Sequence, residues 1–187
     1  MEKIIALDKK IFVFLNNLGS APYDNFWLLI TKQLHWTPFF FLLAYLVYKK
    51  IGGKRLGILL LTIAVMLVFT DQITNLVKDS VQRLRPCNDI EIKHLIRIIK
   101  SSDTYSYFSG HASNSTASMT LLFLILRRYY NYSYLIFAFP LIFAYSRIYL
   151  GLHFPLDIIT GYIFGALIGF IFYKLYEYIT VKYATNS

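Results

Sequence analysis

The sequence predicts an all-α membrane protein, a polytopic transmembrane helical bundle of about five to six spans with amphipathic helices at the interface. Of its 187 residues, 57% are hydrophobic and only 16% are charged, which is too apolar for a soluble domain of this length. The apolar residues gather into runs near the ~20 residues that cross a bilayer, and Lys and Arg crowd the short segments between them. We expect one membrane domain over residues 1–187.

Residues 1–18 predict an amphipathic helix that lies at the membrane interface. A cleavable signal peptide is the alternative, but charges interrupt the stretch and no small-residue cleavage site leads into a soluble domain. We therefore expect this helix to remain in the mature protein. The apolar positions at helical spacing are Ile4, Leu7, Ile11, Leu15 and Leu18.

Five apolar runs then predict the spans. The first extends from about Asn25 to Tyr48, with Pro38 expected to kink it, and a basic turn around Gly52 and Gly53 connects it to the second. The third and fourth are somewhat short for a crossing. The spans after the first are predicted at residues 55–77, 112–126, 134–149 and 156–176.

Only the connection 79–110 is long. Within it, apolar residues face one way and basic residues another at helical spacing, which predicts a second interfacial helix beside the ends of the spans. The apolar positions of this predicted helix are Ile92, Leu95, Ile96 and Ile99.

Two features inside the spans indicate helix packing. Gly161, Gly165 and Gly169 repeat at four-residue spacing on one face of the last span, which favours close approach of another helix. Asp71 lies deep in the second span, where an unpaired acid is costly, and we expect it to support Lys78 or a neighbouring helix.

Three short clusters of polar residues stand at the ends of spans. Counting crossings from the second span places all three clusters on one membrane face. The second and fourth spans end on that face, and the third and fifth spans begin on it. Cationic groups match the charge of a phosphate, and a histidine backed by a carboxylate suits attack on its phosphorus, so the set predicts a phosphoryl-transfer site. The clusters read Lys78-x6-Arg85-Pro86, Ser109-Gly110-His111 and Ser146-Arg147-x5-His153-x3-Asp157.

Their spacing assigns a role to each histidine. His153 and Asp157 are i and i+4 at the start of a helix, so the carboxylate can hold one imidazole nitrogen and leave the other free as the nucleophile. His111 comes from another segment and has no carboxylate at helical spacing, which suits the general acid that protonates the leaving oxygen.

Phosphate binding is assigned to cations and to the start of a helix. Side-chain cations neutralise the non-bridging oxygens, and a serine with a backbone N–H at a helix N-terminus completes an anion site. Because these cations occupy the part that Mg²⁺ plays elsewhere, we expect neither a metal ion nor a cofactor. The phosphate-binding residues are predicted to be Lys78, Arg85, Ser109, Gly110 and Arg147.

Taken together, the three clusters resemble the signature of the type-2 phosphatidic acid phosphatase superfamily of membrane lipid phosphatases. The resemblance covers about residues 54–176, the expected catalytic helical core, and three ordered motifs are far more specific than one. Spacing matches throughout the first and third, whereas Phe108 stands where the family usually has proline, a change that removes no phosphate ligand. The family's known roles agree with those assigned above, and the resemblance implies a lipid phosphatase.

A lipid substrate is expected, because a soluble substrate would not demand a site at the bilayer surface. Undecaprenyl diphosphate, phosphatidylglycerol phosphate, phosphatidic acid and the phosphates of lipid A all stay open as candidates. A phosphotransferase that passes the group to a second lipid is the alternative within enzymes. A transporter or scaffold is a third, less favoured because the key charges cluster at span ends and no internal repeat is evident.

Charge and cysteine content exclude other classes. The net charge is +9, but the basic residues stand at span ends without a stripe of stacking aromatics, so no nucleic-acid partner is expected. Cys87 is the only cysteine, so the chain forms no internal disulfide and offers no zinc spacing. Basic short loops mark the cytoplasmic face, which places the site on the periplasmic or outer face of the cytoplasmic (inner) membrane. Oligomeric state stays open.

Overall fold

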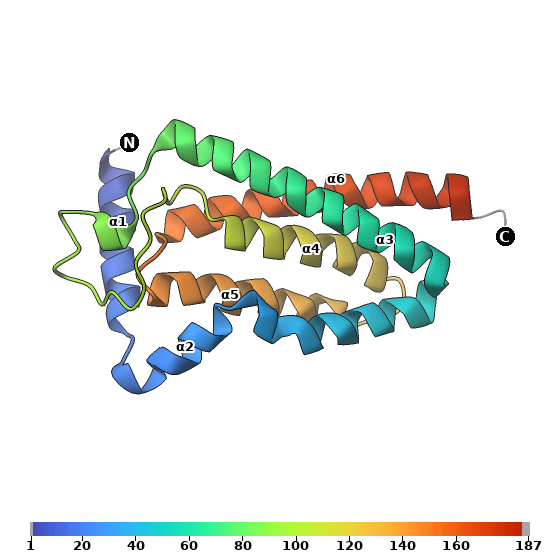
Figure 1. The fold of residues 1–187 in the computed structure, drawn as a ribbon, viewed down its shortest axis with the longest axis horizontal. Coiled ribbons are helices and arrows are strands. Elements are labelled where there is room, and N and C mark those ends of the chain that lie inside the picture. Colours follow the sequence, from blue (N-terminus) through green and yellow to red (C-terminus); the bar gives the residue numbers. More distant parts are fainter. Residues whose placement is uncertain (1, 185–187) are drawn as a thin grey trace.

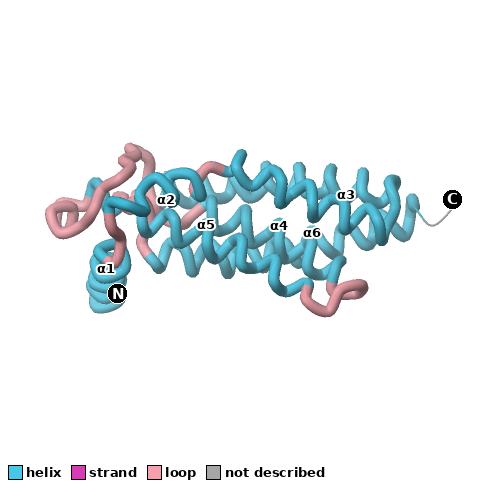
Figure 2. The backbone as a smooth tube through the Cα atoms, turned by 90° about the horizontal axis from the view of Figure 1, so that it is seen from below, coloured by secondary structure: helices cyan, strands magenta, loops and turns pink. Residues whose placement is uncertain are grey.

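The computed structural model describes residues 2–184, and this part of the chain is helical and holds no strand. Helices α3 to α6 form an elongated bundle, and α1 lies across one end of it (Figure 1). Seen from below, most of the loop tracing gathers at that same end (Figure 2). The all-α prediction is confirmed. The helices are α1 (Glu2–Asn17), α2 (Asp24–Ile30), α3 (Thr37–Val81), α4 (Gly110–Leu126), α5 (Ala138–Tyr149) and α6 (Pro155–Ala184), with 3-10 turns at Ala21–Tyr23, Gln33–Trp36, Pro86–Asn88 and Ser133–Phe137.

Helix α3 consists of two helical halves that meet at Gly52. This residue has a φ of 76°, in the left-handed region that glycine adopts without a steric penalty. The chain reverses there, so residues 37–51 and 53–81 run in opposite directions along the bundle (Figure 1). The predicted turn is confirmed, and the second half ends beside the starts of α4 and α6.

Length and composition identify membrane-crossing segments among the described residues. Two stretches are long and apolar enough, Gln33–Asn88, which contains both halves of α3, and Pro155–Tyr183. Ser133–Tyr149 is a shorter apolar helix. These stretches fit a membrane protein and include three of the predicted spans.

The predicted first span, residues 25–48, is wrong over its first half, because α3 begins only at Thr37. Residues 24–30 form the separate helix α2, and a 3-10 turn divides it from α3. Pro38 does not kink a helix but stands in the first turn of α3, where its missing N–H leaves no helical hydrogen bond unmade. The proline therefore marks the start of the span at Thr37.

The predicted second interfacial helix is also wrong, because residues 92–100 form turns. The N–H of Arg97 donates to the Asn16 side chain of α1 at 2.7 Å. The N–H of Lys100 donates to the Leu150 carbonyl at 3.2 Å. Backbone groups in this segment pair with distant parts of the chain and not with each other as in a helix, although the apolar spacing is helical.

Helix α1 confirms the predicted N-terminal helix but buries its polar positions. Asp8, Phe12 and Asn16, spaced four apart, are the buried residues, and the Asn16 amide donates to two backbone carbonyls at the end of α5 and to one in the long loop 82–109. The exposed positions combine large apolar residues with charged ones such as Lys3 and Lys10, which fits a helix at the membrane interface. Its exposed residues include Ile4, Leu7, Ile11, Phe14 and Leu18.

Helices α4 and α6 pack backbone to backbone. A Cβ added at Gly161 would lie 2.7 Å from the Ser109 carbonyl oxygen, and one added at Gly169 would lie 2.5 Å from that of Ala117. Gly165 approaches the Ser113 carbonyl in the same way. The predicted close packing through glycine is confirmed, and it fixes the two helices that begin at the candidate site.

Candidate active site

The three clusters meet at the end of the bundle beside α1. The chain passes this end at the end of α3, the start of α4, the end of α5 and the start of α6, as expected from counting crossings (Figure 1). The structure thus brings together all the residues that the motifs singled out. Lys78 lies in the last turn of α3, Arg85 in the loop after it, Ser109, Gly110 and His111 at the start of α4, Arg147 in the last turn of α5, and His153 and Asp157 at the start of α6.

His153 is held as a neutral ring with a defined tautomer. It is only 1% exposed, and its Nε2 lies 3.1 Å from Nη1 of Arg85. Because a guanidinium only donates, Nε2 accepts and the ring proton resides on Nδ1. Burial lowers the pKa of His153 well below its usual value, and the positive charges of Arg85 and Arg147 lower this pKa further. The free lone pair of the ring therefore belongs to Nε2.

Asp157 faces the other side of this ring. Its Oδ2 lies 3.4 Å from Nδ1 of His153, within ion-pair distance. Nδ1 forms no hydrogen bond with any of the described residues. The same Oδ2 accepts from the N–H of Phe154 at 3.0 Å, so the carboxylate also caps the start of its own helix. A fully buried carboxylate is thereby fixed one turn from the histidine.

Arg83 is a site residue that the motif reasoning missed. Its Nη1 donates to Oδ1 of Asp157 at 2.7 Å, and its Nη2 donates to Oδ2 of Asp8 in α1 at 2.6 Å. One signal was present in the sequence, because Arg83 stands only two positions before Arg85 of the first cluster. No local pattern indicated Asp8, which comes from a helix predicted to lie apart from the site.

Arg85 is clamped in the loop after α3. Its Nε donates to the Thr104 carbonyl and its Nη2 to the Thr104 hydroxyl, both at 2.8 Å, while Nη1 donates to the Leu152 carbonyl at 2.9 Å. Burial lowers the pKa of Arg85, but an arginine stays charged at neutral pH. These contacts hold a positive charge directly at Nε2 of His153.

Arg147 is buried at 6% exposure and keeps donors available. Its Nη1 donates to the hydroxyl of Thr31 at 2.7 Å, whereas its Nε has no hydrogen-bond partner among the described residues. Its carbonyl accepts from the N–H groups of Leu152 and His153, at 2.9 and 3.3 Å. Arg147 therefore shapes the loop that carries His153 and offers an unpaired donor to an anion.

The start of α4 is tied to the start of α6. Ser109 is the N-cap of α4, and its own N–H donates to the Asp157 carbonyl at 3.0 Å. Phe108, which replaces the usual proline, is buried against Phe164 with the ring centroids 4.9 Å apart. Packing thus holds the turn that a proline ring would otherwise restrict. The free N–H groups of the first turn of α4 lie at this end of the bundle.

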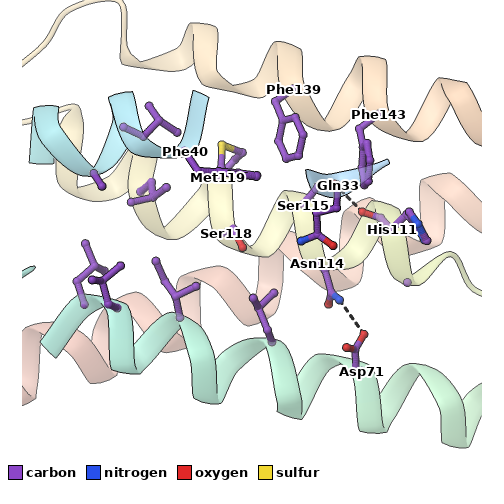
Figure 3. Close-up of a pocket in the computed structure, with 18 of the residues that line it drawn as sticks. Gln33, Phe40, Asp71, His111, Asn114, Ser115, Ser118, Met119, Phe139 and Phe143 are labelled. Atoms are coloured by element: carbon purple, nitrogen blue, oxygen red, sulfur yellow. Dashed lines mark hydrogen bonds between the residues drawn. The ribbon is translucent and has the colours of Figure 1, made fainter. Parts of the chain in front are cut away.

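A cavity of about 490 Å³ extends from His111 and Lys78 along the bundle. Figure 3 shows His111 at one side of it, with its ring against Phe143 at a centroid distance of 5.2 Å. Deeper in the cavity, the Asn114 amide donates to Asp71 at 2.7 Å, so Asp71 supports the neighbouring helix α4. His153 is not among the lining residues. The other walls are mostly apolar, including Phe40, Leu43, Val47, Leu59, Ile63, Leu67, Met119, Leu122 and Phe139.

The chemistry of the site is that of an anion receptor. Four cations, Lys78, Arg83, Arg85 and Arg147, lie around the imidazole of His153 and the carboxylate of Asp157. No group of three metal-ligating side chains gathers within residues 2–184. Charge-assisted donors of this kind suit the oxygens of a phosphate. A tetrahedral anion bound here would meet the lone pair of His153.

The chain is similar to known membrane phosphatases in sequence and in fold. A lipid A 4'-phosphatase of Bacteroides thetaiotaomicron is 28% identical over 100% of this chain and 84% of its own length. An undecaprenyl-diphosphatase of Sulfolobus acidocaldarius is 30% identical over 91% of this chain and 79% of its own length. The crystal structure of a transmembrane PAP2 type phosphatidylglycerolphosphate phosphatase from Bacillus subtilis superposes with a TM-score of 0.73 at 16% identity, covering 96% of this chain and 89% of that one.

The family model of the PAP2 superfamily matches residues 55–180, which include all three clusters and the half of α3 that carries Lys78. The chain therefore belongs to the PAP2 superfamily.

Proposed function

We propose that this protein is an integral-membrane lipid phosphatase that hydrolyses a phosphomonoester or diphosphate on a lipid headgroup through a phosphohistidine at His153, without a metal ion. The observation that carries the proposal is the ring of His153, neutral and protonated on Nδ1, with Nε2 at a cation and Nδ1 at a carboxylate. This is the arrangement of an imidazole prepared to attack an anion.

In the first step, Nε2 of His153 attacks phosphorus and the bond to the lipid oxygen breaks. His111 gives its proton to the leaving oxygen, so the lipid departs as an alcohol or a monophosphate. Lys78, Arg85 and Arg147 balance the charge on the non-bridging oxygens, the part that Mg²⁺ plays in other phosphoryl-transfer sites. The phosphorylated ring is positive, and Asp157 accepts the Nδ1 proton in a hydrogen bond that stabilises this charge.

In the second step, water attacks the phosphohistidine. His111, now neutral, takes a proton from that water, the N–P bond breaks, and inorganic phosphate leaves. The ring of His153 returns to its neutral state, and His111 is again protonated for the next lipid. Two histidines on opposite sides of one phosphorus thus serve both halves of the cycle.

A lipid substrate is supported by the cavity. Its walls are mostly apolar side chains of α3, α4 and α5, while His111 and Lys78 stand at one end. A lipid whose phosphate is held among the cations would have its apolar tail against these helices. The relatives named above act on lipid A and on undecaprenyl diphosphate, and we propose these two classes as the first substrates to test.

The proposed placement has five spans, formed by the two halves of α3 and by α4, α5 and α6, with α1 at the interface beside the site. The basic turns lie at the opposite end of the bundle, at the Gly52 reversal and at Arg127 and Arg128. The positive-inside rule puts that end in the cytoplasm and the site outside. This arrangement makes residues 1–187 one membrane domain.

The deciding experiment measures phosphate release by the detergent-purified protein from lipid A, prenyl diphosphates and phospholipid monophosphates, with and without chelator. We expect turnover that survives chelation and is abolished in His153→Ala. His94→Ala, which changes an exposed histidine outside the site, is the matched control and should keep wild-type activity. Chelator-sensitive turnover would contradict the metal-free mechanism, and full activity of His153→Ala would contradict the nucleophile.

A phosphotransferase differs only in the second step, where a lipid hydroxyl replaces water. Supplying a second lipid alongside the first and identifying the phosphorylated product separates the two activities. We expect inorganic phosphate as the main product. A phosphorylated second lipid as the main product would show that the protein is a phosphotransferase.

A further inference from the structure

We propose that Asp8 and Arg83 are positioning residues for Asp157, so that the N-terminal helix α1 takes part in the reaction through a buried chain of charges. This inference rests on the proposed function, in which Asp157 stabilises the phosphorylated ring of His153. None of the three motifs includes Asp8, and Arg83 is an unassigned position within the first.

The geometry of the chain is that of one guanidinium shared by two carboxylates. Nη2 of Arg83 lies 2.6 Å from Oδ2 of Asp8, and Nη1 lies 2.7 Å from Oδ1 of Asp157. The side chains of Asp8 and Asp157 are 5% and 0% exposed, and that of Arg83 is 17% exposed. Ion pairs so shielded from water keep most of their strength and direction.

Further contacts hold the side chains of Asp8 and Arg83 in place. Oδ1 of Asp8 accepts from the N–H of Leu156 at 2.9 Å, in the first turn of the helix that carries Asp157. The Arg83 guanidinium carbon lies 3.9 Å from the centroid of the Phe154 ring, over its face. Asp8 therefore fixes both the partner of Asp157 and the helix start on which Asp157 stands.

The charge balance explains why a second carboxylate is needed. Arg83 alone would neutralise Asp157, and a neutral pair stabilises a positive ring poorly. With Asp8 included, two negative charges face one positive charge, so the chain keeps one net negative charge beside His153. That charge matters when the ring becomes positive on phosphorylation, so its loss slows the reaction more than it weakens substrate binding.

The test compares Asp8→Asn with a control on the next residue of the same helix. Lys9 forms ion pairs with Asp89 and Glu91 at 2.7 and 2.8 Å, so Lys9→Met loosens α1 from the loop without touching the charge chain. We expect Asp8→Asn to lower kcat by about tenfold or more with KM nearly unchanged, the size set by one charged hydrogen bond. Asp8→Glu should restore part of the loss, and Lys9→Met should leave kcat near wild type.

A double-mutant cycle tests whether Asp8 acts through Arg83. In an Arg83→Gln background, Asp8→Asn should cause little further loss of kcat, because the charge it opposes is gone. Arg83→Met, which also removes the charge but keeps an apolar side chain of similar length against the Phe154 ring, replaces Arg83→Gln if that variant does not fold. Independent, multiplicative losses would overturn the inference.

Other outcomes separate this inference from the function beneath it. Equal losses of kcat in Asp8→Asn and Lys9→Met would reduce α1 to a docking element and overturn the positioning role. Wild-type kcat in Asp8→Asn, with His153→Ala inactive, would overturn this inference alone. Activity retained in His153→Ala would instead overturn the proposed function.

Discussion

At the scale of single residues, the site combines the neutral imidazole of His153 with fixed charges on neighbouring side chains. Burial and the neighbouring cations Arg85, Arg147 and Lys78 all disfavour a proton on His153, so its pKa lies well below the usual 6.5. His153 therefore stays neutral at pH values where an exposed histidine would be charged. In the mechanism proposed above, this direction keeps the nucleophile unprotonated.

This direction of the pKa predicts the acid side of the pH profile. In the wild type, protonation of His153 should reduce kcat/KM only at pH values below 6.5, the usual pKa of a histidine. Arg85→Gln removes one of these three cations, so the pKa of His153 should rise and the acid limb should move to higher pH, in addition to a loss of rate. Profiles of kcat/KM against pH for both proteins with one substrate measure this shift.

Substrate ionisation is common to both profiles, so their difference isolates the enzyme. Arg127→Gln, at the opposite end of the bundle, is the control and should leave the limb in place. An acid limb that stays fixed in Arg85→Gln would show that another group controls it. The same sign applies to folding: the unfolded chain binds the His153 proton more readily, so His153 lowers stability as pH falls below about 6.5.

At the scale of elements, the packing of α4 on α6 determines how the clusters meet. His111 opens α4 and Asp157 lies in the first turn of α6, and the glycine face of α6 lets these helices touch along their length. The sequence predicted this face correctly because a four-residue repeat is a local signal. It misjudged residues 92–100, where local periodicity is overridden by hydrogen bonds to distant segments.

A glycine substitution tests the role of this contact. A Cβ at Gly165 would meet the Ser113 Cα at 3.0 Å and the Ala117 nitrogen at 3.1 Å, all rigid backbone. Gly165→Ala should therefore destabilise the protein by about 1–3 kcal/mol through overpacking and should lower activity as the two helices separate. Thermal unfolding in detergent, together with phosphate release, measures both effects.

Gly57→Ala in α3 is the matched control, because no atom lies within 4 Å of an added Cβ there. The intrinsic preference of a helix for alanine over glycine is about 1 kcal/mol, so this variant should be unchanged or slightly more stable. Equal unfolding temperatures for both variants would show that the glycine face does not set the packing.

At the scale of the whole molecule, the reversal at Gly52 and the antiparallel run of α4, α5 and α6 put every catalytic candidate at one end and the short basic turns at the other (Figure 1). Orientation in the membrane therefore decides which compartment receives the phosphate. We propose the outer side, because Lys and Arg in short loops favour the cytoplasm.

Cysteine labelling of intact cells tests this orientation. Ile90, beside the site, and Tyr132, in the turn between α4 and α5, are 76% and 71% exposed, while the native Cys87 is buried and gives little background. A membrane-impermeant maleimide should label Ile90→Cys directly and Tyr132→Cys only after permeabilisation. The reverse pattern would invert the proposed orientation.

The membrane setting, most of the helical segments and the meeting of the three clusters at one end could be predicted from the sequence. These depend on hydropathy, local spacing and the parity of crossings, all of which a single chain displays.

Only the tertiary structure decided which groups hold the catalytic candidates. The contacts of Asp8 with Arg83 and with Leu156 join residues 75 and 148 positions apart, and the clamp of Arg85 on Thr104 depends on how a long loop folds back. Periodicity tells which face of a helix is buried but not what it is buried against. Charge pairing between distant segments leaves no local pattern, so the partners become visible only when the helices are packed.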